Sequence, residues 1–324
     1  MRKVKLLAFC VGALVGSIII FGNAEAQKLN YPVKPVEMIV SYPAGGGADT
    51  FSRILAKHTE KYWAGKIVVV NKVGGGGVIG NAEIARSKPD GYTVGYLAPD
   101  NVTHQWIAKG CPYTYKDFFP VVMMTADPLF LLIKNSLNMD FKQFIEYVRK
   151  SPGKVSIGMG GNWSAHDFLR AKMEKAIGIH FLKTPFQGGA PAAQAVAGGH
   201  VDSSTAFIAE GLPLIEGKLV NPVAVSSAER LPAFPNIPTI REQGYDVVHT
   251  MWRGISVPPK TPKEIVDILE EAFTKTFNDP EFRKDLQKAG VFPIFKNHKE
   301  FVKYYNEEAE RYAALLKELG VVAQ

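Results

Sequence analysis

The stretch SYPAGGGADTFSR, residues 41–53, places three consecutive glycines between an apolar run and a helix-like segment. The apolar run, residues 36–40, has the length and composition of a buried strand. Glycine at such a point lets the backbone turn tightly or approach a ligand closely, because it carries no Cβ. Strand, loop and helix in this order are typical of α/β proteins, which bind ligands beyond the carboxyl ends of their strands. We therefore expect this loop to hold a ligand.

The same alternation continues along the chain. Strand-like runs occupy residues 36–42, 66–70, 93–97, 121–124, 129–133, 155–157, 180–183, 201–205, 223–226 and 254–257. Helix-like patterns occupy residues 50–62, 81–87, 141–151, 164–176 and 190–197. The alternation predicts an α/β fold with mostly parallel sheets and crossover helices.

The sequence predicts two helices in the C-terminal region. Thr261 and Glu264 have the spacing of a capping box, and Pro262 would be the first helical residue. A second helix is expected over residues 299–319, with its aromatic and leucine side chains roughly on one side. Two helices after the last strand predict that the chain returns to pack on its first domain.

The first 26 residues have the pattern of a secretory signal peptide. Basic residues at the start precede an apolar stretch, 6–21, and Ala24-Glu25-Ala26 offers a cleavage site after Ala26. The alternative is an uncleaved membrane anchor. Export to the periplasm would leave Cys111 as the only cysteine, so no intramolecular disulfide is expected. The formal net charge of +7 is compatible with anionic ligands, but no basic and aromatic patch indicates nucleic acid.

Four glycine-rich loops lie at predicted strand-to-helix turns: 42–49, 73–80, 158–164 and 186–192. Free N–H groups and the helix dipole favour an anion at such turns. The first loop lacks the Lys-Ser/Thr of a nucleoside triphosphate site. Residues 75–80 fit the spacing of a dinucleotide loop, but no acidic residue ends a following strand as the ribose requires. We expect neither a nucleotide nor any other cofactor, and no metal.

The candidate catalytic residues form no convincing active site. Ser164 and His166 are near neighbours, but the glycines that surround a nucleophilic serine in hydrolases are missing. Asp49, at the junction of loop and helix, is expected to cap the helix rather than to act as a base. We interpret His166 as a packed or capping residue, whereas Trp252 fits the core or the lining of a cleft equally well.

Four segments in order resemble the periplasmic solute receptors of tripartite tricarboxylate transporters, also known as Bordetella uptake gene receptors. The segments are YPVKPVEMIVSYPAGGGADTFSR (31–53), NKVGGGGVIGNAEIARSKPDGYTV (71–94), TPFQGGAPAAQAVAGGHVD (184–202) and NPVAVSSAERLPAFPNIPTIREQGYD (221–246). The resemblance runs from about residue 31 to the end of the chain. Because four signatures occur in order, it is specific.

The resemblance implies a two-lobed, type II periplasmic binding protein fold, with two mostly parallel sheets joined by two crossover strands. Hinges at about 126–132 and 250–255 would divide the chain into a discontinuous first lobe, 27–127 plus 253–324, and a second lobe, 128–252. Such a receptor is a monomer without enzymatic activity. It captures an aromatic acid, a dicarboxylate or a tricarboxylate and delivers it to membrane transporter subunits. The alternatives are an exported α/β hydrolase and a receptor that feeds a signalling system.

Members of this family clamp a ligand carboxylate with backbone amides of the first and fourth loops. The resemblance therefore implies a ligand site at Tyr42, Ala44, Gly45, Gly46, Gly47, Ala48, Asp49, Asn162, Trp163, Ser164, Phe186, Gln187, Gly188, Gly189, Ala190, Phe207 and Arg253.

The sequence departs from the family pattern at several of these positions. Gln187 stands where a cation is common, and the region around Phe207 lacks an acidic-amide pair, which makes the far end of the pocket less polar. Trp163 either covers an apolar ligand or walls the cleft. Arg253 either meets a second carboxylate or forms a salt bridge between the lobes.

Overall fold

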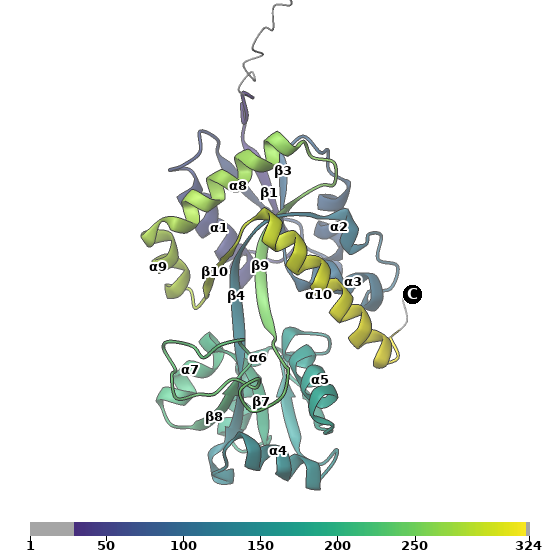
Figure 1. The fold of residues 1–324 in the computed structure, drawn as a ribbon, viewed down its shortest axis with the longest axis vertical. Coiled ribbons are helices and arrows are strands. Elements are labelled where there is room, and N and C mark those ends of the chain that lie inside the picture. The colour runs from purple at the N-terminus through teal and green to yellow at the C-terminus, as the bar shows by residue number, and fades with distance from the viewer. Residues whose placement is uncertain (1–28, 322–324) are drawn as a thin grey trace, which may run out of the picture. The chain divides into compact units, whose positions relative to one another are not determined.

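The computed structural model describes residues 29–321, drawn in colour in Figure 1. The predicted signal peptide and its predicted cleavage after Ala26 lie outside the described residues. The chain divides into two units, Met1–Asn30 and Tyr31–Gln324, and the fold is that of the second. Among residues 29–321, no helix combines the length and the apolar character needed to cross a bilayer.

Strands and helices alternate through most of the second unit. The strands are β1 (Val36–Val40), β2 (Ile67–Asn71), β3 (Thr93–Leu97), β4 (Phe119–Lys134), β5 (Ser156–Met159), β6 (Leu182–Pro185), β7 (Ser203–Phe207), β8 (Val220–Val225), β9 (Thr250–Val257) and β10 (Pro293–Lys296). The helices are α1 (Gly47–Thr59), α2 (Val78–Arg86), α3 (Pro99–Ile107), α4 (Phe141–Lys150), α5 (Ala165–Ile177), α6 (Gly189–Ala197), α7 (Ile208–Glu216), α8 (Lys263–Asn278), α9 (Pro280–Lys288) and α10 (His298–Glu318). Short 3₁₀ turns occur at Gly75–Gly77, Tyr115–Asp117 and Asn135–Leu137.

The strands pair in the order β2-β1-β3-β9-β4-β7-β5-β6, with β8 and β10 also on β4. The pairs β1–β2, β1–β3, β5–β6 and β5–β7 are parallel, whereas those that β4 and β9 make are antiparallel. The first half of β4 pairs with β9, and its second half pairs with β7 and β8. These long central strands run between the two groups of helices in Figure 1 and are the crossover strands of a two-lobed α/β fold.

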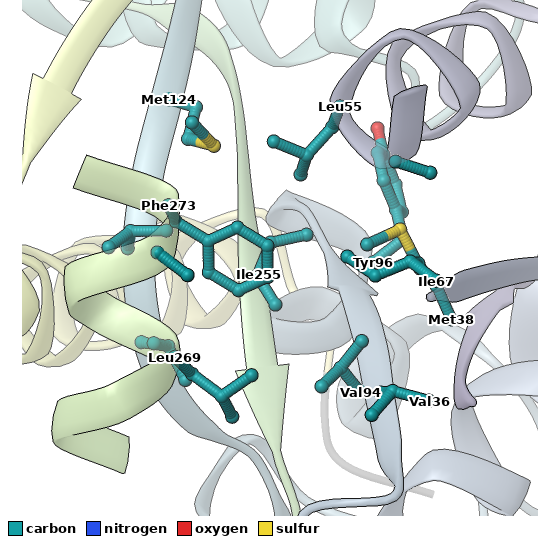
Figure 2. Close-up of a cluster of buried hydrophobic side chains, with 14 of the residues drawn as sticks. Val36, Met38, Leu55, Ile67, Val94, Tyr96, Met124, Ile255, Leu269 and Phe273 are labelled. Atoms are coloured by element: carbon teal, nitrogen blue, oxygen red, sulfur yellow. The ribbon is translucent and has the colours of Figure 1, made fainter. Parts of the chain in front are cut away.

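The core of the first lobe joins the two ends of the chain. Met38 of β1 and Leu55 of α1 pack with Ile255 of β9 and with Leu269 and Phe273 of α8 (Figure 2). All five side chains are fully buried. The C-terminal helices thus return to the first strands, as the sequence predicted. On these contacts we propose the lobe bounds 27–127 plus 253–324 and 128–252.

The second lobe has a core on each face of β4. Leu129, Leu131 and Ile133 point to one face, which α4 and α5 cover, and Phe130 and Leu132 point to the other, which α6 covers. Successive side chains alternate between the faces of a strand, so a run that is apolar at every position must be buried on both sides.

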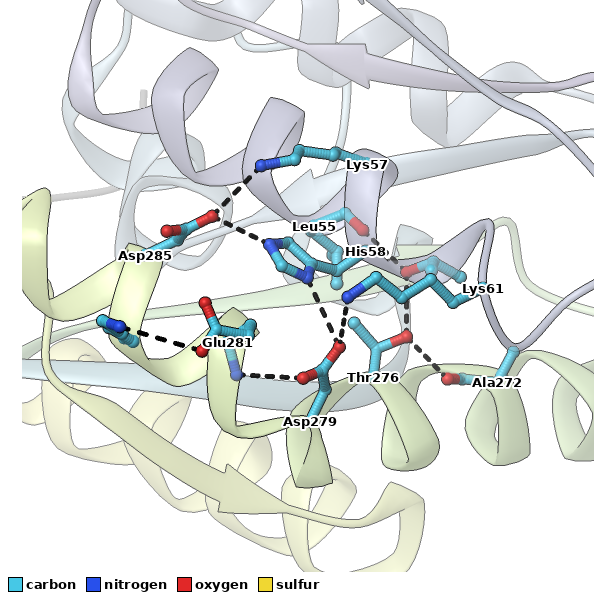
Figure 3. Close-up of polar contacts among 11 residues, drawn as sticks. Leu55, Lys57, His58, Lys61, Ala272, Thr276, Asp279, Glu281 and Asp285 are labelled. Atoms are coloured by element: carbon cyan, nitrogen blue, oxygen red, sulfur yellow. Dashed lines mark hydrogen bonds and ion pairs between the residues drawn. The ribbon is translucent and has the colours of Figure 1, made fainter.

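A polar network ties α1 to the C-terminal helices (Figure 3). The His58 imidazole is buried, and its Nε2 lies 2.9 Å from Asp285 Oδ2. Lys61 donates to Asp279 Oδ2 (2.8 Å), and Asp279 also accepts from the Glu281 N–H as the N-cap of α9. These hydrogen bonds, chiefly that of Lys61, hold the pKa of Asp279 well below its usual value.

The structure corrects several sequence-based expectations. Residues 121–124 and 129–133 belong to one strand, because Ala126 and Pro128, which lie between them, are also paired with β9. The predicted capping box is wrong: α8 begins at Lys263, and the Thr261 hydroxyl donates to the Pro258 carbonyl instead. The elements α3, α7, α9 and β10 were not predicted from the sequence. Trp252 belongs to the core, fully buried against α10.

Candidate ligand-binding site

Asp49 fixes the first glycine loop. Its Oδ2 accepts from the Gly45 N–H (2.8 Å) and from Arg53 Nε (3.0 Å). Asn71, at the end of β2, donates both to Asp49 Oδ1 (3.0 Å) and to the Tyr42 carbonyl (2.9 Å). Although burial opposes ionisation, the hydrogen bonds from Arg53, Gly45 and Asn71 hold the pKa of Asp49 below its usual value. The expectation that Asp49 caps α1 is wrong, because Gly46 is the N-cap and Asp49 lies inside the first turn. Asp49 orients the loop instead, through its hydrogen bond from Gly45.

The amides available to a ligand lie at the start of α1. Gly45 donates to Asp49, and Gly46 donates to the Pro43 carbonyl (3.3 Å), so both are used within the loop. The N–H groups of Gly47, Ala48 and Asp49 are the first three of the helix and have no partner within it. An anion held by this loop would meet these three amides.

Arg253 belongs to β9, one of the two crossover strands, and its side chain lies close to this helix. Its Nη1 forms an ion pair with Asp127 of β4, and both side chains are largely buried. Asp127 also accepts from the Phe292 N–H (2.6 Å). A Cβ on Gly47 would lie 3.8 Å from Arg253 Nη2, which places the guanidinium beside the start of α1. By the proposed bounds both residues belong to the first lobe, so this ion pair is not the bridge between the lobes that the sequence suggested. Arg253 Nη2 lies near the proposed anion site.

Hydrogen bonds also fix the third loop. The Trp163 N–H donates to Asp167 Oδ2 (3.0 Å), and the Ser164 hydroxyl donates to the Gly161 carbonyl (2.8 Å). Ser164 is also the N-cap of α5, accepting from the Asp167 N–H. Because its hydroxyl makes both of these hydrogen bonds, Ser164 caps α5 and its hydroxyl is not free.

The fourth loop packs on a pair formed by a buried histidine and a partly buried carboxylate. His166 Nε2 lies 2.9 Å from Glu210 Oε2, which also accepts from the Phe207 N–H (2.8 Å). The His166 ring packs edge-on against Phe207, so it is a packed residue as expected. A Cβ on Gly189 would lie 2.1 Å from Glu210 Oε2 and 2.2 Å from His166 Nε2, so a larger residue there would displace this pair. Glu210 was not predicted from the sequence, although it stands three residues after Phe207, at the start of α7, where a capping-box acid is found.

A cavity of about 390 Å³ opens between elements of both lobes. Of the predicted site residues it brings together Tyr42, Asn162, Trp163 and Ser164. The remaining predicted residues do not line it: Ala44, Gly45, Gly46, Gly47, Ala48, Asp49, Phe186, Gln187, Gly188, Gly189, Ala190, Phe207 and Arg253.

One wall of this cavity was not predicted from the sequence. That wall is a face of α3, made by Pro99, Asp100, Thr103, His104 and Ile107. Their spacing is that of a helix face, and a proline at the first helical position was the signal that could have revealed α3. Met251 of β9 and Tyr312 of α10 complete the lining.

Comparisons with known proteins agree on one family. Residues 51–321 match the tripartite tricarboxylate transporter family receptor. BugT of Bordetella pertussis is 27% identical over 326 residues, which span 99% of this chain and 99% of BugT. A TctC solute binding protein from Polaromonas, solved without ligand, is 31% identical with a TM-score of 0.83 and covers 89% of this chain and 99% of its own.

A third relative was solved with a ligand. MatC from Rhodopseudomonas palustris, with bound malate, is 25% identical with a TM-score of 0.69, over 88% of this chain and 100% of its own. The matches span most of the described residues and both lobes. The chain belongs to the tripartite tricarboxylate transporter receptor family, whose members are periplasmic solute-binding proteins of the two-lobed type II fold.

Proposed function

We propose that this protein is a periplasmic receptor that captures a small organic carboxylate between its lobes and delivers it to the membrane subunits of a tripartite tricarboxylate-type transporter. It acts as a monomer, after removal of the leader at Ala26, and without catalysis. The observation that carries the proposal is the cavity lined by both lobes, with the start of α5 on one wall. Helix N-termini favour anions because their amides lack partners and the dipole is positive there.

The free amides of α1, in the first lobe, are a second candidate anion site, and their residues do not line the cavity. Gly47, Ala48 and Asp49 would hold a carboxylate with Arg253 Nη2 nearby, and the start of α6 would close on it from the second lobe. Such hydrogen bonds to a charged acceptor are strong when water is excluded. The binding of malate by MatC supports a small carboxylate as the ligand class.

The geometry favours a receptor over a hydrolase. A nucleophilic serine needs a base within hydrogen-bonding reach. Here the Ser164 hydroxyl bonds to Gly161, and His166 bonds to Glu210. A receptor that feeds a signalling system would use the same ligand site, and uptake assays in cells that lack the protein would separate these outputs.

A thermal-shift panel on protein stripped of ligand by unfolding and refolding tests the proposal. We expect aromatic acids, C4–C6 dicarboxylates or citrate to raise the unfolding temperature, whereas their neutral amides do not. A ligand at 100 times its Kd adds about 2.7 kcal/mol, which is a rise of a few degrees for a chain of this size. If no acid shifts the transition, while an ester or amide is turned over, the protein is an enzyme.

A further inference from the structure

A second pocket lies between α5 and α10, and we call it the outer pocket. Its volume is about 500 Å³, which lies within the range of small-molecule sites. Its walls come from α5, from residues 246–248 and from α10, and it shares no lining residue with the cavity described above. By the proposed bounds, α10 belongs to the first lobe and the other walls to the second. A ligand in the outer pocket would therefore contact both lobes.

The same two helices line both pockets. Phe168 of α5 and Tyr312 of α10, whose rings are 4.9 Å apart, line the first cavity. Lys172 follows Phe168 by one turn of α5, Leu315 follows Tyr312 by about one turn of α10, and both line the outer pocket. The outer pocket is thus a separate site, one helical turn beyond this aromatic contact.

The outer pocket gathers positive charge, whereas no Lys or Arg lines the first cavity. Its charged lining residues are four cations and one carboxylate: Lys172, Lys175, Arg241, Arg311 and Asp246. Three of the cations have carboxylate partners: Lys175 with Glu318 (2.8 Å), Arg241 with Asp246 (2.9 Å), and Arg311 with Glu308 (3.0 Å) and Glu307 (3.4 Å). The side chains of these three cations are about half exposed. Exposed ion pairs contribute little to stability, so exchanging a partner for a bound anion costs little.

Lys172 differs from the other three cations because it has no carboxylate partner. Its side chain is partly buried, and it forms no ion pair with another residue of 29–321. Its Nζ donates a long hydrogen bond to the Val248 carbonyl (3.4 Å) and lies 5.2 Å from the centre of the Tyr312 ring. Burial lowers the pKa of Lys172; the charge of Glu308 opposes this shift, and that of Arg311 adds to it. Because an ammonium removed from water without a counter-ion is unfavourable, an anion in the pocket would stabilise it.

We propose that the outer pocket binds a phosphate dianion, either free or as the ester of a small molecule, between Lys172 of α5 and Arg311 of α10. A compact group with two charges and several acceptor oxygens can meet an ammonium and a guanidinium at once, and guanidinium groups match phosphate geometry. The bound phosphate joins the two lobes and stabilises the arrangement in which the pocket is formed. This site is separate from the proposed carboxylate site, and its test does not depend on that site.

Calorimetric titration at low ionic strength and about pH 7.5, where phosphate esters are dianions, tests the inference. The ligands are inorganic phosphate, phenyl phosphate and benzenesulfonate, which resembles phenyl phosphate but carries one charge. The wild-type protein should bind at least one of the two phosphate compounds, and it should bind benzenesulfonate about 10-fold more weakly or less. Tighter binding of phenyl phosphate identifies an ester as the ligand, and equal or tighter binding of inorganic phosphate identifies the free ion.

Two variants, one on each wall, locate the site. Lys172→Gln and Arg311→Gln should each weaken phosphate binding about 10- to 100-fold, the value of a hydrogen bond between charged groups. The Arg311 side chain is 57% exposed, so Arg311→Gln carries the test even if Lys172→Gln fails to fold. The matched control is Lys263→Gln, which removes an exposed cation on α8 and should bind like the wild-type protein.

Three results would overturn the inference and leave the receptor function standing. The first is that neither phosphate compound binds the wild-type protein. The second is that both variants bind phosphate as the wild-type protein does, which would place the anion elsewhere. The third is that the acid found in the thermal-shift panel displaces the phosphate compound, which would place both ligands in one site; the outer pocket predicts that the two bind together.

Discussion

At the scale of single residues, three carboxylates organise the binding region, of which Asp49 and Asp127 are buried and Glu210 is partly buried. Asp49 accepts a hydrogen bond from the first loop. Asp127 of β4 forms an ion pair with Arg253 of β9. Glu210 forms a hydrogen bond with His166 beside the fourth loop. Each is paired with groups from its own lobe or from the neighbouring crossover strand. The loops are therefore preformed, and the ligand does not have to order them, which conserves binding free energy.

Asp49→Asn should lower stability at neutral pH. The folded-state pKa of Asp49 is below its unfolded value of about 3.9, so the ionised carboxylate stabilises the fold above that pH. The stabilisation is lost as the pH falls through the folded-state pKa. We expect a deficit of about 1–3 kcal/mol at pH 7, from weakened hydrogen bonds to a charged group, that shrinks below about pH 4. Denaturant unfolding at several pH values measures it, with Asp267→Asn as the exposed control.

An equal deficit at pH 7 and pH 3 would show that the Asp49 charge contributes nothing. In that case the loop would be held by its backbone and by Asn71 alone.

Sequence could identify the residues whose role is local. The glycines of the first loop and Asp49 stand within nine residues of each other, so the motif itself contains the interaction. Asp100 and Glu210 could not be found in this way, because their partners come from other elements: Asn81 lies 19 residues from Asp100, and His166 lies 44 residues from Glu210. Arg253 was identified, but its pairing with Asp127 depends on the register of β4 and β9.

At the scale of elements, the N-termini of helices supply the proposed contacts with the ligand carboxylate. Parallel strands end at the same edge of a sheet, so the helices that follow β1 and β3 begin near one another, as do those that follow β5, β6 and β7. Alternation in the sequence predicted most of these elements to within a few residues. It missed α3 and α7, because the Pro99 and Pro213 that they contain read as loop signals.

Gly47→Pro tests whether the first helix binds the ligand through its amides. Proline at the first helical position removes only the N–H, and Gly46 already has the extended conformation that proline requires of its predecessor. We expect affinity for the acid found in the thermal-shift panel to fall about 10- to 100-fold, the value of a hydrogen bond to a charged group. Titration calorimetry measures this loss.

Gly47→Ala is the matched control. It keeps the N–H, and its Cβ would make only an ordinary contact with Arg253, at 3.8 Å. It should bind like the wild-type protein. Equal affinity for all three proteins would exclude the Gly47 amide from the site and leave the cavity beside α3 and α5 as the place of binding.

At the scale of the whole described chain, binding and lobe geometry are coupled. Contacts on one side already connect the lobes: the Phe168 and Tyr312 rings are 4.9 Å apart, and Lys175 bonds to Glu318 at 2.8 Å. On the proposed hinges, at 126–132 and 250–255, the lobes would move about the crossover strands. A ligand that touches both lobes stabilises the arrangement to which it binds more tightly. The two-lobed fold itself followed from the resemblance, since strand patterns alone do not fix which strands cross.

Small-angle X-ray scattering, with and without the acid found in the thermal-shift panel, tests the central claim most directly. Capture between the lobes predicts that the acid makes the protein more compact, with a saturation curve that matches its affinity, and that the corresponding neutral amide has no effect. Unchanged scattering at saturating acid would contradict capture by lobe closure and would place the ligand on a surface that does not move.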